Sequence, residues 1–116
     1  RGAAGNDVIN GGDGDDTISG GTGSDLVTGG EGSDQINGEA GNDTLLGDDG
    51  DDSMIGGAGA DILLGGDGDD RISGSGSNAD TVAGNEGDDN LTNNLVSEID
   101  ETFTLATEIL ALLVDV

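Results

Sequence analysis

The sequence predicts an all-β fold, a flattened solenoid in which two short parallel sheets face each other. Residues 2–92 divide into ten consecutive units, each nine residues long except for a ten-residue unit at residues 74–83. Each unit has one regularly placed apolar residue, whereas an amphipathic helix needs three or four in every two turns. Gly and Asp recur at fixed places in the unit, as tight turns require. A repeated turn followed by a short strand therefore fits the pattern better than a helix.

Three columns define the unit, whose residues we number from position one to position nine. Position one is Gly in all ten units, and position four is Gly in nine of them. Position six is always Asp, counting the shifted residue of the long unit: Asp7, Asp16, Asp25, Asp34, Asp43, Asp52, Asp61, Asp70, Asp80 and Asp89. Position eight is always aliphatic or Met: Ile9, Ile18, Val27, Ile36, Leu45, Met54, Leu63, Ile72, Val82 and Leu91. Composition alone would suit a disordered acidic linker, but such a linker has no reason to keep these columns.

Each unit is expected to form a turn of six residues and then a strand of three, in which only position eight points inward. Two units then make one coil, and successive coils stack about 4.8 Å apart. Position eight of the odd units forms one inner ladder, and position eight of the even units forms the other. The Asp residues of units i and i+2 stack along the same edge, where their like charges would push the coils apart.

Composition excludes several classes of function. The chain has 116 residues, 26 of them acidic, with two Arg, no Cys, no His and a formal net charge of −24. Without Cys or His, a disulfide framework, a thiolate site and a zinc site of the usual kind are excluded. We expect no nucleic-acid partner, because the charge is repulsive, and no membrane-spanning segment, because no apolar run is long enough. Arg1 is expected to open a processed product or an excised piece.

The Asp column points to a hard cation. Carboxylate and carbonyl oxygens without His or Cys are the ligand set of Ca²⁺, which takes six to eight oxygens. Mg²⁺ is the poorer candidate, because it demands strict octahedral geometry and keeps its waters. An EF-hand is excluded, since the repeat lacks the 12-residue loop and its flanking helices.

The repeat Gly-Gly-x-Gly-x-Asp-x-aliphatic-x resembles the RTX (repeats-in-toxin, haemolysin-type) calcium-binding nonapeptide over residues 2–92. The resemblance implies a right-handed parallel β-roll with Ca²⁺ between adjacent turns. It makes the position-six Asp side chains ligands, together with backbone carbonyl groups of the turns: Gly5, Gly14, Gly23, Gly32, Gly41, Gly50, Gly59, Gly68 and Gly87. Five units along each edge leave four gaps, so roughly eight ions would fit.

Some units depart from the pattern. Position two is not Gly in five units, where the local turn should be weaker: Ala3, Glu39, Asp48, Ser75 and Asn85. The ninth unit is one residue longer, so we expect a bulge around residues 75–79 and a weaker or missing ion beside it. The acids at position five are expected to form a solvated rim: Asp15, Asp51, Asp69 and Asp88.

Residues 93–116 form a second segment, rich in apolar residues and without Gly. Residues 97–100 resemble a helix N-terminus, and Ile99, Phe103, Ala106, Leu110 and Leu113 would share one helical face. Three Thr residues between positions 102 and 107 argue for a strand instead, but the prediction is a helix. The segment is expected to cap the open end of the solenoid, with an export signal as the alternative.

A smaller apolar group stands on the outward-facing positions of units five to seven: Leu46, Ile55, Ile62 and Leu64. It could seat the tail or a partner, or be without a role, since single exposed aliphatic residues are common.

Together, these features predict a calcium-binding module that folds on Ca²⁺ binding. The resemblance implies an extracellular, secreted or cell-surface bacterial protein exported by type I secretion, with an effector or adhesin domain upstream. The alternative is a self-assembling or adhesive element of a surface layer or filament, since uncapped solenoids can associate end to end. An enzyme is not expected, because the Asp residues are committed as ligands and no His is present.

Overall fold

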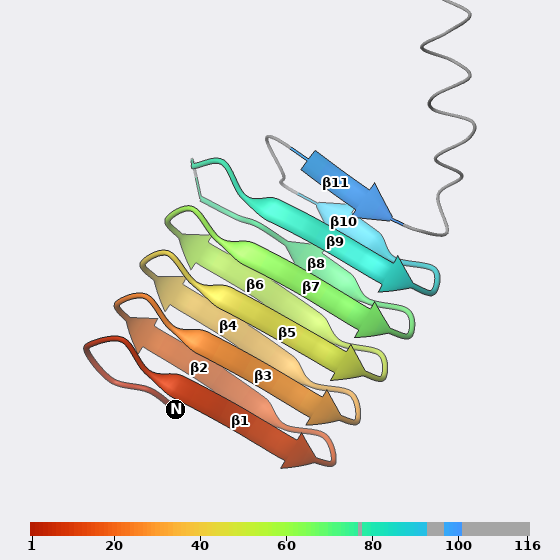
Figure 1. The fold of residues 1–116 in the computed structure, drawn as a ribbon, viewed down its shortest axis with the longest axis horizontal. Helices are drawn as coiled ribbons and strands as arrows, with labels where there is room; N and C mark the ends of the chain where they lie inside the picture. The colour runs from red at the N-terminus through yellow and green to blue at the C-terminus, as the bar shows by residue number, and fades with distance from the viewer. Residues whose placement is uncertain (77, 93–96, 101–116) are drawn as a thin grey trace, which may run out of the picture.

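The computed structural model describes residues 1–76, 78–92 and 97–100, and the fold built by them is all-β. Figure 1 shows the strands stacked as the rungs of a solenoid. The strands are β1 (Val8–Asp13), β2 (Thr17–Thr22), β3 (Leu26–Glu31), β4 (Gln35–Ala40), β5 (Thr44–Asp49), β6 (Ser53–Ala58), β7 (Ile62–Asp67), β8 (Arg71–Ser73), β9 (Thr81–Glu86), β10 (Asn90–Thr92) and β11 (Ser97–Asp100).

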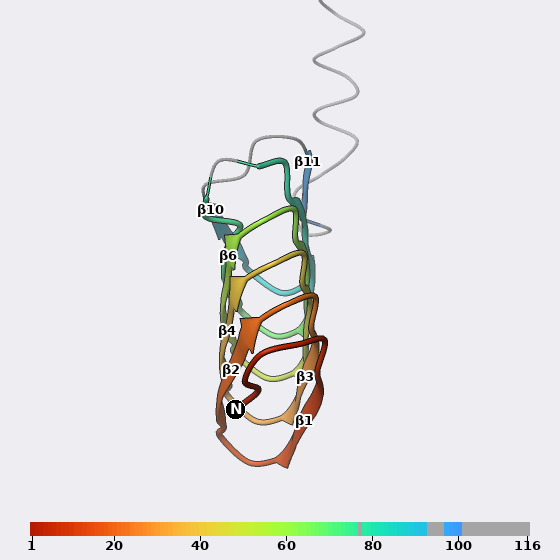
Figure 2. The same cartoon turned by 90° about the vertical axis from the view of Figure 1, so that its left-hand side faces the viewer.

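The chain alternates between two parallel sheets. One sheet has the order β1-β3-β5-β7-β9-β11 and the other the order β10-β8-β6-β4-β2. Figure 2 shows the two sheets facing each other in a flattened coil. Val27 pairs with Ile9 on one side and Leu45 on the other, so one coil takes two units. The structure therefore confirms the predicted parallel β-solenoid of about five coils, with odd units in one sheet and even units in the other.

The core lies between the sheets and consists of the position-eight ladders. Its fully buried members are no more than 5% exposed: Ile18, Val27, Ile36, Leu45, Met54, Leu63, Ile72 and Val82. Ile9 and Leu91 lie at the two ends of the ladders and are partly buried against this core. The core is one side chain deep, because each strand contributes one large apolar residue.

The strands are longer than expected, which corrects the prediction of three-residue strands and six-residue turns. Eight of the first ten strands, all except β8 and β10, continue through the next unit's first three positions, as β3 does through Gly29, Gly30 and Glu31. The next coil offers the same residues in register, so these backbone groups bond across coils. At the turn itself, the N–H of Gly23 donates to the carbonyl oxygen of Ala40 at 2.8 Å.

Positive φ angles occur at positions two and four of the repeat. At position four, Gly41 has a φ of 135°, which is outside the range that a residue with a Cβ adopts readily. At position two, four non-glycine residues hold φ angles of 64–78°: Glu39, Asp48, Ser75 and Asn85. The turns with these residues keep the left-handed conformation, and the side chain makes that conformation costly.

The long ninth unit interrupts only one sheet. β8 ends at Ser73, the last residue of its unit, whereas β6 continues for three residues into the next unit. The chain rejoins the register at β9, where Val82 pairs with Leu63. The N–H of Asp61 still donates to Asp80 Oδ1 at 3.0 Å. The irregularity expected around residues 75–79 is therefore confined between β8 and β9, and residue 77 lies outside the described residues.

The segment after residue 96 corrects the helix expectation in part. Ser97–Asp100, which resembled the first turn of a helix, is strand β11 and pairs in parallel with β9. β9 has unpaired backbone groups along its free edge, and pairing satisfies them, which outweighs the helix-capping signal. Residues 101–116, where the rest of the predicted helical face falls, lie outside the described residues.

The expected apolar group does not form one patch. Leu46, Ile62 and Leu64 lie on β5 and β7, whereas Ile55 lies on β6 in the opposite sheet. Over the described part of the chain, the structure has no helix long and apolar enough to span a membrane.

Candidate metal centre

The position-six aspartates form two continuous columns, one along each edge of the solenoid. In one column, the backbone N–H of Asp25 donates to Oδ1 of Asp43 at 2.9 Å, and the N–H of Asp43 donates to Oδ1 of Asp61 at 2.9 Å. In the other, the N–H of Asp34 donates to Oδ1 of Asp52 at 2.8 Å. Each carboxylate thus ties its own coil to the coil before it through one oxygen.

These carboxylates are buried, which the sequence analysis did not predict. The buried members are at most 3% exposed: Asp25, Asp34, Asp43, Asp52, Asp61, Asp70 and Asp80. Side chains alternate along a strand, so positions six and eight both face the space between the sheets. The structure therefore places carboxylates in the interior beside the aliphatic core.

The second oxygen of each buried carboxylate has no hydrogen-bond partner. This holds for eight buried Oδ2 atoms: those of Asp16, Asp25, Asp34, Asp43, Asp52, Asp61, Asp70 and Asp80. A buried carboxylate oxygen without a donor or cation is strongly unfavourable. These eight atoms therefore form an ordered series of acceptors that no donor of the described residues satisfies.

The position-one glycines make room for these oxygens. A Cβ on Gly20 would lie 2.7 Å from Asp25 Oδ2, and a Cβ on Gly56 would lie 2.5 Å from Asp61 Oδ2. These glycines are not among the residues with positive φ. Space beside the carboxylate, rather than backbone conformation, thus explains why position one is Gly in every unit.

Burial raises the pKa of several of these carboxyl groups. Desolvation, together with the charges of neighbouring acids, raises the pKa of Asp52 to about 6 and that of Asp70 to about 7, although a backbone hydrogen bond to each carboxylate acts in the lowering direction. On the other edge, desolvation also raises the pKa of Asp43 and Asp61. The ionised columns are therefore costly at neutral pH unless a positive charge compensates them.

The position-four glycines also stack coil on coil. A Cβ on Gly41 would overlap the carbonyl oxygen of Gly23 one coil before it, and a Cβ on Gly50 would overlap that of Gly32. These carbonyl oxygens therefore point along the edge toward the next coil. They lie in the same three-residue turns as the Asp columns.

Position five contributes a second ladder that the sequence analysis missed. The N–H of Ser24 donates to Asn6 Oδ1, and the N–H of Asp69 donates to Asp51 Oδ1, both at 2.9 Å. The acids expected at the rim are exposed, as predicted, but three of them also accept such bonds: Asp15, Asp51 and Asp69. The preference for Asn or Asp at position five was the available signal.

The acids are distributed unevenly between the two edges, which the sequence analysis also missed. We call the edge built by residues 14–16, 32–34, 50–52, 68–70 and 87–89, with the strand ends before them, the acidic edge. It holds fifteen of the 21 acidic residues within residues 1–92, and the opposite edge holds six. The signal is an 18-residue period: position three is acidic in every even unit and in no odd unit.

The described residues contain no group of three or more acidic side chains already converged on one point. A cation at either edge would therefore draw its ligands from carboxylates of adjacent coils together with backbone carbonyl oxygens. Such an all-oxygen set suits a hard divalent ion of flexible coordination.

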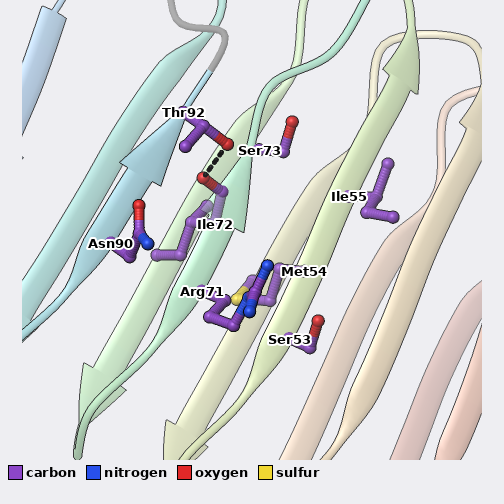
Figure 3. Close-up of a pocket in the computed structure, with 8 residues that line it drawn as sticks. All are labelled: Ser53, Met54, Ile55, Arg71, Ile72, Ser73, Asn90 and Thr92. Atoms are coloured by element: carbon purple, nitrogen blue, oxygen red, sulfur yellow. Dashed lines mark hydrogen bonds between the residues drawn. The ribbon is translucent and has the colours of Figure 1, made fainter.

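A separate hollow lies on the outer face of the second sheet (Figure 3). It has a volume of about 140 Å³ and is lined by Ser53, Met54, Ile55, Arg71, Ile72, Ser73, Asn90 and Thr92. Thr92 Oγ1 donates to the carbonyl oxygen of Ile72 across it at 3.5 Å. It has no carboxylate and it contains Arg71, so it does not suit a cation.

Comparison with known proteins gives one family match. The model of the RTX calcium-binding nonapeptide repeat, which describes four copies, matches residues 1–27, 10–45, 19–54, 28–63, 46–78 and 74–92. No curated protein and no solved structure matches the chain. The matched segments together span the whole solenoid up to β10.

Proposed function

The chain belongs to the family of RTX calcium-binding nonapeptide repeats, and on this basis we propose that it is a calcium-binding module that folds when the ion binds. Repeats of this family bind Ca²⁺ in proteins that are typically secreted by bacteria, and their β-roll is a structural domain rather than an enzymatic one. The proposal for this chain concerns which residues hold the ion and what the ion does to the fold.

One observation supports the proposal most strongly. Eight buried Asp Oδ2 atoms lie without a hydrogen-bond donor in two columns that run along the edges. A divalent ion between coils would satisfy oxygens from both of its neighbours and cancel the repulsion between them. Within residues 1–76 and 78–92 no donor satisfies these eight oxygens, and this part of the chain has only two Arg against its acids.

The proposed ligands are the ten position-six Asp side chains and the position-four carbonyl groups named in the sequence analysis. Ca²⁺ bound there would supply positive charge and oxygen coordination between neighbouring turns. Hydrogen bonds to Oδ1 hold these carboxylates in place, and the position-one glycines leave room for Oδ2. With four gaps along each edge, roughly eight ions are expected.

Binding would couple to folding because the ion sites exist only in the stacked coils. An ion that binds only the folded chain stabilises it by mass action. Where Ca²⁺ is scarce, as in a bacterial cytosol, the chain would stay unfolded and suit export by one-step (type I) secretion. Outside the cell, where Ca²⁺ is abundant, it would fold.

Circular dichroism of the full chain tests this proposal. In EDTA at pH 7.5 the spectrum should be that of an unfolded chain, and millimolar CaCl₂ at the same pH should produce a β-sheet spectrum. MgCl₂ at the same concentration is the matched control and should produce little change, because Mg²⁺ resists full dehydration. A chain with the same β-sheet spectrum in EDTA and in CaCl₂ contradicts the proposal.

A further inference from the structure

The two edges of the solenoid differ in a way that the repeat pattern does not require. The Asp columns are equal, with five carboxylates on each edge. The remaining acids are not: ten lie on the acidic edge and only Glu39 lies on the opposite edge. The two series of proposed ion sites therefore experience different electrostatic surroundings.

The largest part of this difference is a ladder of exposed acids at position three. Its members are in register on neighbouring odd strands: Asp13, Glu31, Asp49, Asp67 and Glu86. The position-three residues of the odd units, which belong to the opposite edge, are small and uncharged: Ala4, Thr22, Ala40, Ala58 and Gly76. A hollow of about 370 Å³ at the acidic edge is lined in part by Asp13, Glu31, Asp48 and Asp49.

Buried acceptors lie behind these exposed acids. Asp34, Asp52 and Asp70 belong to the turns of the acidic edge, are 1–2% exposed, and each has an unpartnered Oδ2 atom. Asp25, Asp43 and Asp61 provide the same arrangement on the opposite edge. The proposed sites on the two edges thus have the same ligand side chains but differ in the number of acidic residues around them.

Charge balance then separates the two series. Four divalent ions would carry eight positive charges, which is about half of the charge of the fifteen acids on the acidic edge. The same four ions would exceed the charge of the six acids on the opposite edge. Each ion added to the opposite edge therefore meets a smaller attraction, and the last ones meet repulsion.

We infer that calcium loads this solenoid in two classes, first and more tightly along the acidic edge, then along the opposite edge. This inference rests on the proposed function, since it concerns the order in which the same sites fill. The first class stacks the coils, and the second class binds to a solenoid that is already formed. The acidic ladder at position three raises the calcium affinity of the acidic edge without coordinating the ion.

A CaCl₂ titration of the full chain tests the inference, with bound ions counted by native mass spectrometry and folding followed by circular dichroism. About half of the ions should bind at calcium concentrations at least about tenfold lower than the rest. Most of the change in circular dichroism should accompany this first class. Added KCl should narrow the separation, because salt screens the exposed ladder.

Two variants assign the classes to the edges. The variant D13N/E31Q/D49N/D67N/E86Q neutralises the exposed ladder, and should weaken the tight class about tenfold while changing the weak class by less than about twofold. The matched variant T22E/A58E/A60D adds three exposed acids to the opposite edge. It should strengthen the weak class several-fold.

The outcomes separate this inference from the proposed function. A chain that binds several ions in a single class, or a ladder variant that weakens both classes equally, overturns the two-class inference and leaves calcium binding intact. A chain that binds no calcium overturns the proposed function itself. Because all substituted residues of the ladder variant are exposed at strand ends, its β-sheet spectrum in saturating CaCl₂ verifies that it folds.

Discussion

At the scale of single residues, the fold depends on pairs of positions that serve one another. The position-six carboxylate needs the bare α-carbon of the position-one glycine, since a Cβ on Gly38 would lie 2.5 Å from Asp43 Oδ2. The same carboxylate accepts the N–H of the Asp one coil before it. One residue therefore links two coils and leaves its second oxygen for the proposed cation.

The first prediction concerns one buried carboxylate. Asp52→Asn keeps the shape and the Oδ1 acceptor for the N–H of Asp34, but removes the charge. We expect the calcium concentration at the folding midpoint to rise about tenfold or more, because a charged ligand is lost. Asp51→Asn is the control: its side chain is exposed, and Asn can still accept from the N–H of Asp69. A CaCl₂ titration with equal midpoints for the two variants would contradict the role of Asp52.

The second prediction concerns backbone strain. Ser75 holds a φ of 64°, so Ser75→Gly should stabilise the calcium-loaded solenoid by up to about 1 kcal/mol. Gly41 has a φ of 135°, and a Cβ there would overlap the Gly23 carbonyl oxygen, so Gly41→Ala should cost more than about 2 kcal/mol. Urea unfolding in constant CaCl₂ measures both. Equal stabilities for the two variants would show that the turns relax freely.

At the scale of the strands, the aliphatic core is thin and each rung depends on one side chain. Leu63 is fully buried between the sheets, whereas its neighbour Leu64 is only partly buried. Alternation along the strand thus gives adjacent, chemically identical residues different roles.

The third prediction uses this adjacent pair. Leu63→Ala should lower the free energy of unfolding by about 2–5 kcal/mol, because it leaves a cavity in a core with little else to fill it. Leu64→Ala should lower it by less than about 1 kcal/mol. Urea unfolding of both variants in saturating CaCl₂ is the measurement. A similar loss in both would mean that the core does not hold the rungs in the way described.

The repeat columns were sufficient to predict most of this architecture. The nine-residue period assigned Ile9, Val27 and Leu45 to one ladder, because identical units must pair in register. Strand length was underestimated, because glycines at positions one and two are typical of turns. These residues become part of a strand only because their backbone groups form hydrogen bonds with the neighbouring coil. The helix predicted from Ser97 was wrong at β11, where the open edge of β9 decides the conformation. The Oδ1 bonds were missed, because they depend on the spacing between coils.

At the scale of the whole molecule, we expect charge rather than apolar burial to set the conditions for folding. The chain carries a net charge of −24, and its central acids stand in columns one coil apart. Protons and calcium ions can both relieve this charge. Protons should therefore stabilise the folded chain at low pH, and calcium ions should stabilise it at neutral pH.

The fourth prediction concerns pH without calcium. Burial raises the pKa of Asp52 to about 6 and that of Asp70 to about 7, so the folded chain binds more protons than the unfolded chain between about pH 4 and pH 7. Stability without calcium should therefore fall as the pH rises through this window. In EDTA, lowering the pH from 7.5 to 4.5 should increase the β-sheet signal in circular dichroism.

Calcium affinity should rise as the pH rises, because protons compete with calcium for the same carboxylates. The midpoint of a CaCl₂ titration should move to higher concentration as the pH falls from 7.5 to 5.5. A midpoint independent of pH in this range would mean that the buried columns are not the ligands.

The most direct test of the account is a crystal structure of the full chain grown in CaCl₂, with anomalous data collected to locate calcium. We predict a row of calcium peaks along each edge, between coils, within bonding distance of the Asp Oδ2 atoms. Well-ordered coils with no calcium beside these oxygens would contradict the claim that the ion holds neighbouring coils together.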